Sequence, residues 1–298
     1  MIRTEGLSKY YGRSPALLDL DLEVRAGEVF GYLGPNGSGK TTTIRLLLGL
    51  IRPSSGRAEV LGEEVGTNPV SVHRRLAFVP GDSALWPELT GGETLHLLGR
   101  MHGAVDAAYG RELVERFDLD PSKRVRSYSR GNRQKVSLIA ALMTRAELLI
   151  MDEPTAGLDP LMEQVFRECV REAQSGGQTV FLSSHVLAEV EALCGRVGIL
   201  RSGRLVETGT LDTMRLHSSL TVEASFDGAP VPDVEAVPGV QDVRVEGGSL
   251  RCRVDGPVAP LLEVLSRAGA TRLISREPSL EELFLTHYGT DPGDRNDG

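Results

Sequence analysis

The sequence lacks long apolar runs and has few cysteines. None of its 298 residues lies in a segment that approaches the roughly 20 consecutive apolar residues of a membrane-spanning helix. The start, MIRTEGLSKYYG, has no apolar stretch typical of a secretory signal. The three cysteines are scattered without CxxC spacing, which favours buried reduced thiols over a metal or redox role. We therefore expect a protein of the cytosol.

Basic residues, 33 in number, are fewer than the 41 acidic ones. The net charge of -8 argues against broad attraction to nucleic acid or anionic lipid, because a negative field repels both. Attachment to a membrane would then require a protein partner. Hydrophobic residues at 40% and charged residues at 25% are typical of a globular protein, so a disordered or fibrous chain is excluded. The length suits two domains of unequal size.

Three apolar segments predict strands of a parallel sheet. Residues 28–50 predict a short strand, a glycine-rich turn and a helix that carries Ile44, Leu47, Leu48 and Leu50. LLIMDEP at 148–154 and TVFLSSH at 179–185 predict two more buried strands. Strands separated by helical stretches indicate the α/β class, with a parallel sheet covered by helices.

The flanking segments predict three further regions. Residues 16–29 alternate apolar and polar side chains, which indicates an N-terminal antiparallel β layer. Residues 85–142 have helical periodicity and predict a helical subdomain. After residue 218, three strand-like segments and one amphipathic helix predict a small α+β domain similar to a split βαβ unit. We expect domains at 1–217 and 218–290 and a frayed tail at 291–298.

A complete phosphate-binding loop, GPNGSGKT, follows the first predicted strand. Its glycines allow backbone N–H groups to turn inward around phosphate oxygens, and the following helix directs its positive end at them. Lys40 supplies a charge for the β and γ phosphates, and the Thr41 hydroxyl is placed to ligate Mg²⁺. The expected phosphate-binding residues are Gly34, Pro35, Asn36, Gly37, Ser38, Gly39, Lys40, Thr41 and Thr42.

Two other observations narrow the chemistry. The position three beyond Gly39 is Thr42, so a GxGxxG dinucleotide fingerprint does not fit this loop and a nicotinamide enzyme is disfavoured. LLIMDEP places Asp152 and Glu153 at the end of a buried strand, where Asp152 can hold a metal through water and Glu153 can orient an attacking water. Paired acids at strand ends are common, so this motif alone is weak evidence for catalysis. The phosphate-binding Lys40 upstream favours a catalytic role for the pair.

These motifs occur with three further ones, in an order that resembles the ATP-binding cassette (ABC) transporter family over residues 1 to about 217. The additional matches are YSRGN at Tyr128 to Asn132, AGLD at Ala156 to Asp159, and His185 after TVFLSS. The resemblance implies a P-loop NTPase cassette that binds ATP and Mg²⁺ and hydrolyses ATP. It also implies a head-to-tail dimer, with a second copy or a homologous cassette, that holds two ATP molecules between the subunits.

The resemblance further implies roles for single residues. Glu153 would be the general base, His185 would contact the γ-phosphate, and Asp159 would line the dimer seam, although Asp159 before Pro160 equally fits a helix N-cap. Tyr11 matches the aromatic on which adenine stacks, with Tyr10 as its competitor and a core position open for either.

YSRGN belongs to the opposite subunit's active site in such cassettes. Ser129 and the Gly131 N–H open a helix whose terminus can meet the γ-phosphate. The segment departs from the usual LSGGQ at Tyr128, Arg130 and Asn132. Arg130 and Asn132 are kept in the expected nucleotide-binding set, and Arg130 either adds a charge near the nucleotide or points to solvent.

A larger departure lies at FVPGDSALWPELT, where the family has a metal-ligating glutamine at the position of Gly81. Either Asp82 reaches the metal through water or Gly81 only makes a turn. Trp86 and Leu89 in the same segment are expected permease contacts, with packing as the alternative.

The C-terminal region resembles the appendage of bacterial cassettes that serve drug, antibiotic or polysaccharide exporters with separately encoded permeases. We therefore expect an export ATPase, peripheral on the inner face of the cell membrane through an integral-membrane permease, without a nucleic-acid partner. A soluble ATPase acting on ribosomes or DNA is disfavoured, because the chain has one phosphate loop and no heptad run. An import ATPase is disfavoured because the tail has no clear sensing motif.

Overall fold

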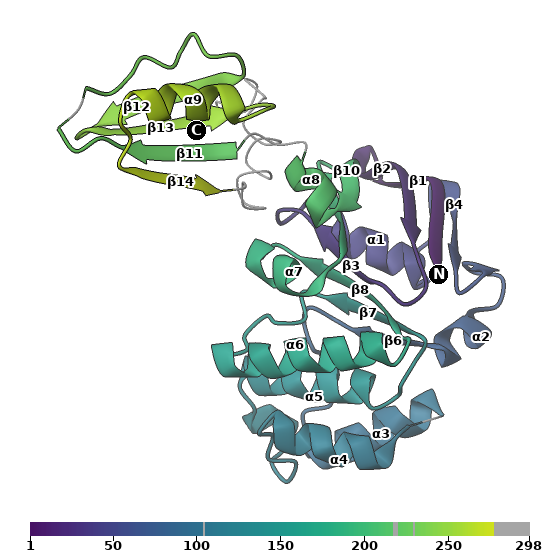
Figure 1. Cartoon of the computed structure of the whole chain (residues 1–298). Coiled ribbons are helices and arrows are strands. Elements are labelled where there is room, and N and C mark those ends of the chain that lie inside the picture. Colours follow the sequence, from purple (N-terminus) through teal and green to yellow (C-terminus); the bar gives the residue numbers. More distant parts are fainter. Residues whose placement is uncertain (104, 217–219, 229, 277–298) are drawn as a thin grey trace, which may run out of the picture. The chain divides into compact units, whose positions relative to one another are not determined.

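A computed structural model describes residues 1–103, 105–216, 220–228 and 230–276 (Figure 1). The chain divides into two compact units, Met1–Gly209 and Thr210–Gly298. The first unit ends within the edge strand β10 (Arg204–Thr210) of its large sheet, and the domain bounds expected from the sequence stay a prediction. Within the described ranges, no helix is both long enough and apolar enough to cross a bilayer.

A six-stranded sheet forms the centre of the first unit, in the order β10-β9-β3-β8-β7-β6. The pairs β3–β8, β3–β9, β6–β7 and β7–β8 are parallel. Every residue of β3, β7 and β8 is buried, as expected for strands covered on both faces. The α/β class and the parallel core are confirmed. The strand bounds are β3 Val29–Leu33, β6 Leu76–Val79, β7 Leu148–Asp152, β8 Thr179–Ser184 and β9 Arg196–Arg201.

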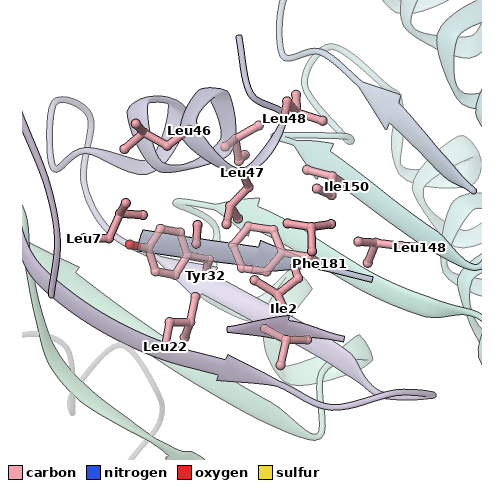
Figure 2. Packing of buried hydrophobic residues seen from close by; sticks show 14 of the residues in the cluster. Ile2, Leu7, Leu22, Tyr32, Leu46, Leu47, Leu48, Leu148, Ile150 and Phe181 are labelled. Atoms are coloured by element: carbon pink, nitrogen blue, oxygen red, sulfur yellow. The ribbon is translucent and has the colours of Figure 1, made fainter. Parts of the chain in front are cut away.

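An N-terminal antiparallel sheet lies beside this core, with the order β2-β1-β4-β5. Its strands are β1 Ile2–Tyr11, β2 Ser14–Val24, β4 Ser55–Val60 and β5 Glu63–Glu64. The helix α1 (Lys40–Leu47) shares one hydrophobic core with both sheets, and Figure 2 shows side chains of α1 around Tyr32 and Phe181. The expected β layer is therefore confirmed.

The end of α1 corrects one expectation. Leu48 caps the helix, and Leu50, which was expected to belong to it, lies beyond it with 61% of its surface exposed. Gly49 has φ +68°, a left-handed backbone that stops a helix at glycine. An apolar residue at the right spacing was therefore not a core residue.

Among the described residues between β6 and β7 the regular elements are helices joined by turns, and Thr90 and Arg124 form an isolated β-bridge. Thr90 and Glu93 form a reciprocal capping box at the start of α3, and Asp106 caps α4. The helices of the first unit beyond α1 are α2 Pro69–Arg74, α3 Gly91–His102, α4 Ala107–Arg116, the 3₁₀ helix η1 Val125–Ser127, α5 Arg130–Leu142, α6 Pro160–Ser175 and α7 Leu187–Leu193.

The second unit contains a four-stranded antiparallel sheet in the order β12-β13-β11-β14. Its elements are α8 Leu211–Leu216, β11 Leu220–Ser225, β12 Val240–Glu246, β13 Ser249–Val254, α9 Ala259–Arg267 and β14 Arg272–Arg276. Since β11 lies between β13 and β14, the path β13–α9–β14 is a split βαβ unit, as the sequence predicted. The expected tail lies outside the described residues.

The cysteines are buried and unbridged, as expected. Burial raises the pKa of the Cys169 thiol to about 11 and raises that of Cys194 well above its usual range. Neither thiol is therefore suited to act as a thiolate nucleophile near neutral pH.

Candidate nucleotide-binding site

The loop between β3 and α1 is shaped by its glycines. Gly37 and Gly39 have φ +80° and +111°. A Cβ on Gly39 would lie 2.5 Å from the Ala16 carbonyl oxygen, and one on Gly34 would lie 2.4 Å from Ser38 Oγ. These positions therefore require glycine, and the backbone is fixed as a turn before the N-terminus of α1.

Ser38 Oγ is the loop atom that fits a ligand best. It is buried, and no group in the described part of the chain forms a hydrogen bond with it. A buried hydroxyl without a partner is costly, so such an atom in a native loop needs an explanation. A phosphate oxygen would supply the missing acceptor, which agrees with the predicted use of the loop.

Lys40 is buried at the start of α1. Its Nζ donates to the carbonyl oxygens of Gly34 at 2.6 Å and Pro35 at 3.2 Å, and lies 3.5 Å from Glu153 Oε1. Burial lowers the pKa of this ammonium, while the charges of Glu153 and Asp152 oppose that shift. The loop carbonyls thus hold the cation where a polyphosphate would need it.

Oxygen atoms converge between α1 and the end of β7. Thr41 Oγ1 donates to Asp152 Oδ2 at 2.8 Å, and Ser183 Oγ donates to Asp152 Oδ1 at 2.5 Å. Asp152 and Ser183 are register partners at the carboxyl ends of β7 and β8. A hydroxyl and a carboxylate are oxygen donors suited to a hard cation, so these residues fit the expected Mg²⁺.

Glu153 follows β7 with its backbone at φ +48°, a strained value for a residue other than glycine. Its N–H is held by Ser183, through the carbonyl oxygen at 3.1 Å and Oγ at 3.2 Å. Its Oε1 lies 3.2 Å from His185 Nδ1. The structure therefore brings together three residues that the sequence separates widely: Lys40, Glu153 and His185.

The YSRGN segment begins α5, whose first residue is Arg130. Ser129 is the N-cap and its Oγ accepts from the Asn132 N–H at 3.2 Å. A Cβ on Gly131 would lie 2.3 Å from the Gly157 carbonyl oxygen, so α5 begins directly against the AGLD segment. The Arg130 side chain is exposed, with its stem beside Gly157.

Tyr128, which departs from the family's leucine, has a structural role. The residue is buried, and its hydroxyl donates to the Asp120 carbonyl oxygen at 2.6 Å. This bond anchors the segment before α5 to the loop after α4.

The structure also decides between the alternatives left open for Asp159 as a helix cap and for the two tyrosines at the end of β1. The expected N-cap is present at Asp159, whose Oδ1 accepts from the Met162 N–H at 3.0 Å at the start of α6. Tyr10 and Tyr11 are 44% and 49% exposed, so the alternative of a core tyrosine is wrong for both.

Asp82 is exposed, and no described contact places it beside the oxygen atoms of Thr41 and Asp152. Gly81 does lie there, since a Cβ on it would be 3.1 Å from the Asp152 carbonyl oxygen.

Sequence reasoning missed Ser183, which holds both Asp152 and Glu153. The sequence does hint at Ser183, because it lies near the end of a predicted strand, two residues before His185. That strand pairs with the one that ends at Asp152. It also missed the buried polar residues Ser83, Gln134 and Ser137, which single polar letters in a helical pattern do not distinguish from surface residues.

The fold and the loop geometry define a P-loop ATPase of the cassette type. Comparison with known proteins agrees. The family model described as ABC transporter matches residues 17–156. The daunorubicin resistance ATP-binding protein DrrA3 of Streptomyces coeruleorubidus is 38% identical, covering 97% of this chain and 96% of its own. The linearmycin resistance ATP-binding protein LnrL of Bacillus subtilis (strain 168) is 32% identical, covering 97% and 98%.

Solved structures are similar over part of the chain. A structure of an ATP-binding subunit of an ABC transporter superposes with a TM-score of 0.68 at 34% identity, covering 72% of this chain and 92% of its own. A dimeric cassette described as MJ0796 has a TM-score of 0.65 at 23% identity, covering 71% and 99%, which shows the shared fold. This chain therefore belongs to the ABC transporter family, as an ATP-binding subunit that hydrolyses ATP.

Proposed function

We propose that the chain powers export of a drug, an antibiotic or another small hydrophobic or lipid-like compound through a separately encoded integral-membrane permease. The observation that carries this proposal is the match along the full length to subunits named for daunorubicin and linearmycin resistance and for Nod factor export. These matches extend through the second unit, where no nucleotide motif lies. Under this proposal the chain works at the inner face of the membrane, where it contacts the permease.

The active form is proposed to be a dimer with ATP held between two copies. One copy contributes the phosphate-binding loop with Ser38 and Lys40, and the other contributes the N-terminus of α5 at Ser129. Two features support this arrangement. Helix N-termini attract phosphate, and α5 begins against Gly157, an exposed residue of the AGLD segment. Arg130, Asn132 and Asp159 are placed at the same proposed seam.

Within each site, the residues have distinct proposed roles. Glu153 accepts a proton from the attacking water, and His185, within hydrogen-bond distance of Oε1, orients that carboxylate and contacts the γ-phosphate. Mg²⁺, held by Thr41 and by Asp152 through water, would neutralise phosphate charge. Tyr11 is proposed to stack on adenine, since its ring is exposed at the end of β1 and lies 5.4 Å from Lys9 Nζ.

Asp82 remains a proposed metal contact that a titration can test. If Asp82 contributes through water, Asp82→Ala raises the Mg²⁺ concentration needed for half-maximal ATP turnover. An unchanged Mg²⁺ requirement removes Asp82 from the site and leaves Gly81 as a turn.

Transport is tested by pairing the chain with its permease. The chain and a co-expressed protein with several membrane spans should co-purify from detergent, and inverted vesicles containing both should accumulate daunorubicin, used as the probe, when ATP is added. Vesicles with Lys40→Ala are the matched control. Daunorubicin uptake equal in the two preparations, or no co-purifying membrane protein, would contradict the proposal. Purification with ribosomes or DNA instead would favour the soluble alternative.

A further inference from the structure

A continuous chain of buried polar side chains runs beside the nucleotide site. Ser137 Oγ donates to Ser83 Oγ at 2.8 Å, and Ser83 Oγ donates to Gln134 Oε1 at 2.9 Å. Gln134 Nε2 in turn donates to the Pro154 carbonyl oxygen at 3.0 Å. Gln134, Ser137 and Ser83 are 2%, 6% and 8% exposed, so water does not compete for these bonds.

The chain joins three segments that are distant in sequence. Ser83 lies in the turn after β6, where Gly81 approaches the Asp152 backbone. Pro154 directly follows Glu153. Gln134 is on α5, whose first turn rests on Gly157. A single side chain therefore connects the 80–89 turn, the residues after β7 and the helix that begins at Ser129.

The chemistry of the connection requires a carboxamide. At one end Gln134 accepts a hydrogen bond, and at the other end it donates one. A carboxylate could accept from Ser83 but could not donate to Pro154. An aliphatic side chain could do neither and would leave the Ser83 hydroxyl and the Pro154 carbonyl oxygen without these partners. Gly81, which has no side chain, cannot make such a link.

We propose that Gln134 is a positioning residue for ATP hydrolysis, which transmits displacement of the 80–89 turn to the backbone that carries Glu153. This inference rests on the proposed function, because that turn is the expected permease contact. Movement of Ser83 would displace the Gln134 carboxamide, which is hydrogen-bonded to the carbonyl oxygen of Pro154, the residue after Glu153. Glu153, the proposed general base, is then aligned with the attacking water only when both the 80–89 turn and α5 are in place.

The test compares four variants of the full chain. Gln134→Glu keeps the acceptor and removes the donor, Ser83→Ala removes the hydroxyl, and Ser83→Thr keeps it. Gln164→Leu is the matched control, since Gln164 is an exposed residue on α6 that contacts Glu168. For each variant, kcat and KM for ATP are measured with and without the permease, and thermal unfolding is followed to verify folding.

We expect kcat to fall by about 10- to 100-fold in Gln134→Glu, because small displacements of a catalytic group cost rate, while KM stays near the wild-type value. Ser83→Ala should lower kcat in the same direction, Ser83→Thr should restore it, and Gln164→Leu should match the wild type. Stimulation of turnover by the permease should be lost in Gln134→Glu and Ser83→Ala.

A spectroscopic readout is independent of turnover. Trp86 is the single tryptophan of the chain, lies three residues from Ser83 and is 44% exposed, so its emission reports the 80–89 turn. ATP should shift this emission in the wild type and in Gln164→Leu, and should leave it unshifted in Gln134→Glu although ATP still binds.

Three outcomes would overturn the proposal. One is a folded Gln134→Glu variant with wild-type kcat and an intact Trp86 response. A second is equal loss of kcat and of ATP affinity together with lower thermal stability, which indicates a purely structural role. The third is a Ser83→Thr variant as impaired as Ser83→Ala. Failure of the permease to stimulate the wild type would count against the proposed function alone, since the kcat and Trp86 measurements without permease still test Gln134.

Discussion

The six-stranded sheet of the first unit and the four-stranded sheet of the second unit differ in where they place their polar groups. In the six-stranded sheet, β3, β7 and β8 are buried throughout, and the polar residues gather at the carboxyl ends, where Asp152 and Ser183 meet. In the C-terminal sheet, β13 alternates between buried and exposed residues, and Arg251 and Arg253 lie on the exposed face. When helices cover both faces of a sheet, its strand ends remain as the positions where polar side chains can reach a ligand. The exposed face of β13 instead carries charged residues along the strand.

The largest expected effect concerns Lys40. Lys40→Ala should reduce ATP turnover by about 100-fold or more, because a buried charge directed at developing phosphate charge is lost. Arg251→Ala, on the exposed face of β13, should leave turnover of the isolated subunit unchanged. Steady-state hydrolysis and nucleotide binding measure both. Comparable losses in the two variants would contradict the distinction between strand ends and open face.

Glu153→Gln tests the same comparison between a carboxylate that follows a strand end and one on an exposed surface. Loss of the proton acceptor should lower turnover by about 100- to 10,000-fold while ATP binding persists. The dimer that forms around ATP should then live longer, which size-exclusion chromatography with ATP measures. Glu168→Gln, a change at an exposed carboxylate of α6, is the control. Full turnover in Glu153→Gln would remove this residue from the proposed role.

The core under α9 tests whether the second unit is stabilised separately. Leu261 is fully buried and Leu262 is 37% exposed, so the neighbours form a matched pair. Leu261→Ala should destabilise the unit by about 2–5 kcal/mol, and Leu262→Ala by far less. Denaturant unfolding measures this difference. Basal ATP turnover should be retained by both variants, and a parallel loss of turnover in Leu261→Ala would show that the units are energetically coupled.

The smallest effect is expected at the capping box of α3. Thr90→Ala removes the hydroxyl that accepts from the Glu93 N–H and should cost about 1 kcal/mol, whereas Thr90→Ser should keep the cap. Chemical denaturation compares the two variants. An equal cost for both would mean that the methyl group of Thr90, rather than its oxygen, carries the contribution.

The sequence predicted the parts of the fold that local chemistry determines. The phosphate loop requires glycine at Gly34 and Gly39, and the structure shows close approaches that only glycine allows. The apolar strand that ends at Asp152 and the split βαβ path through α9 were likewise readable from periodicity. Short edge strands such as β5, with two residues, offer too little pattern to detect.

Long-range contacts of buried polar residues were not predictable. Nothing in the letters of α5 shows that Gln134 reaches Pro154, since its position on the helix also fits a solvent-exposed face. The choice between a core position and an exposed one for Tyr11 likewise depends on how β1 ends, which alternation alone does not determine. The left-handed backbone at Glu153 occurs together with hydrogen bonds from its N–H to Ser183, a residue on another strand, and the local sequence does not reveal these bonds.

That left-handed backbone has a consequence for evolution and engineering. Relieving such a conformation with glycine commonly recovers about 1 kcal/mol, but Glu153→Gly also removes the contact of Glu153 Oε1 with the buried Lys40 Nζ at 3.5 Å. The same substitution removes the carboxylate beside His185. The strained backbone at Glu153 therefore comes with a carboxylate that contacts both Lys40 and His185, and substitutions designed to relieve the strain should be assayed for ATP turnover as well as for thermal stability.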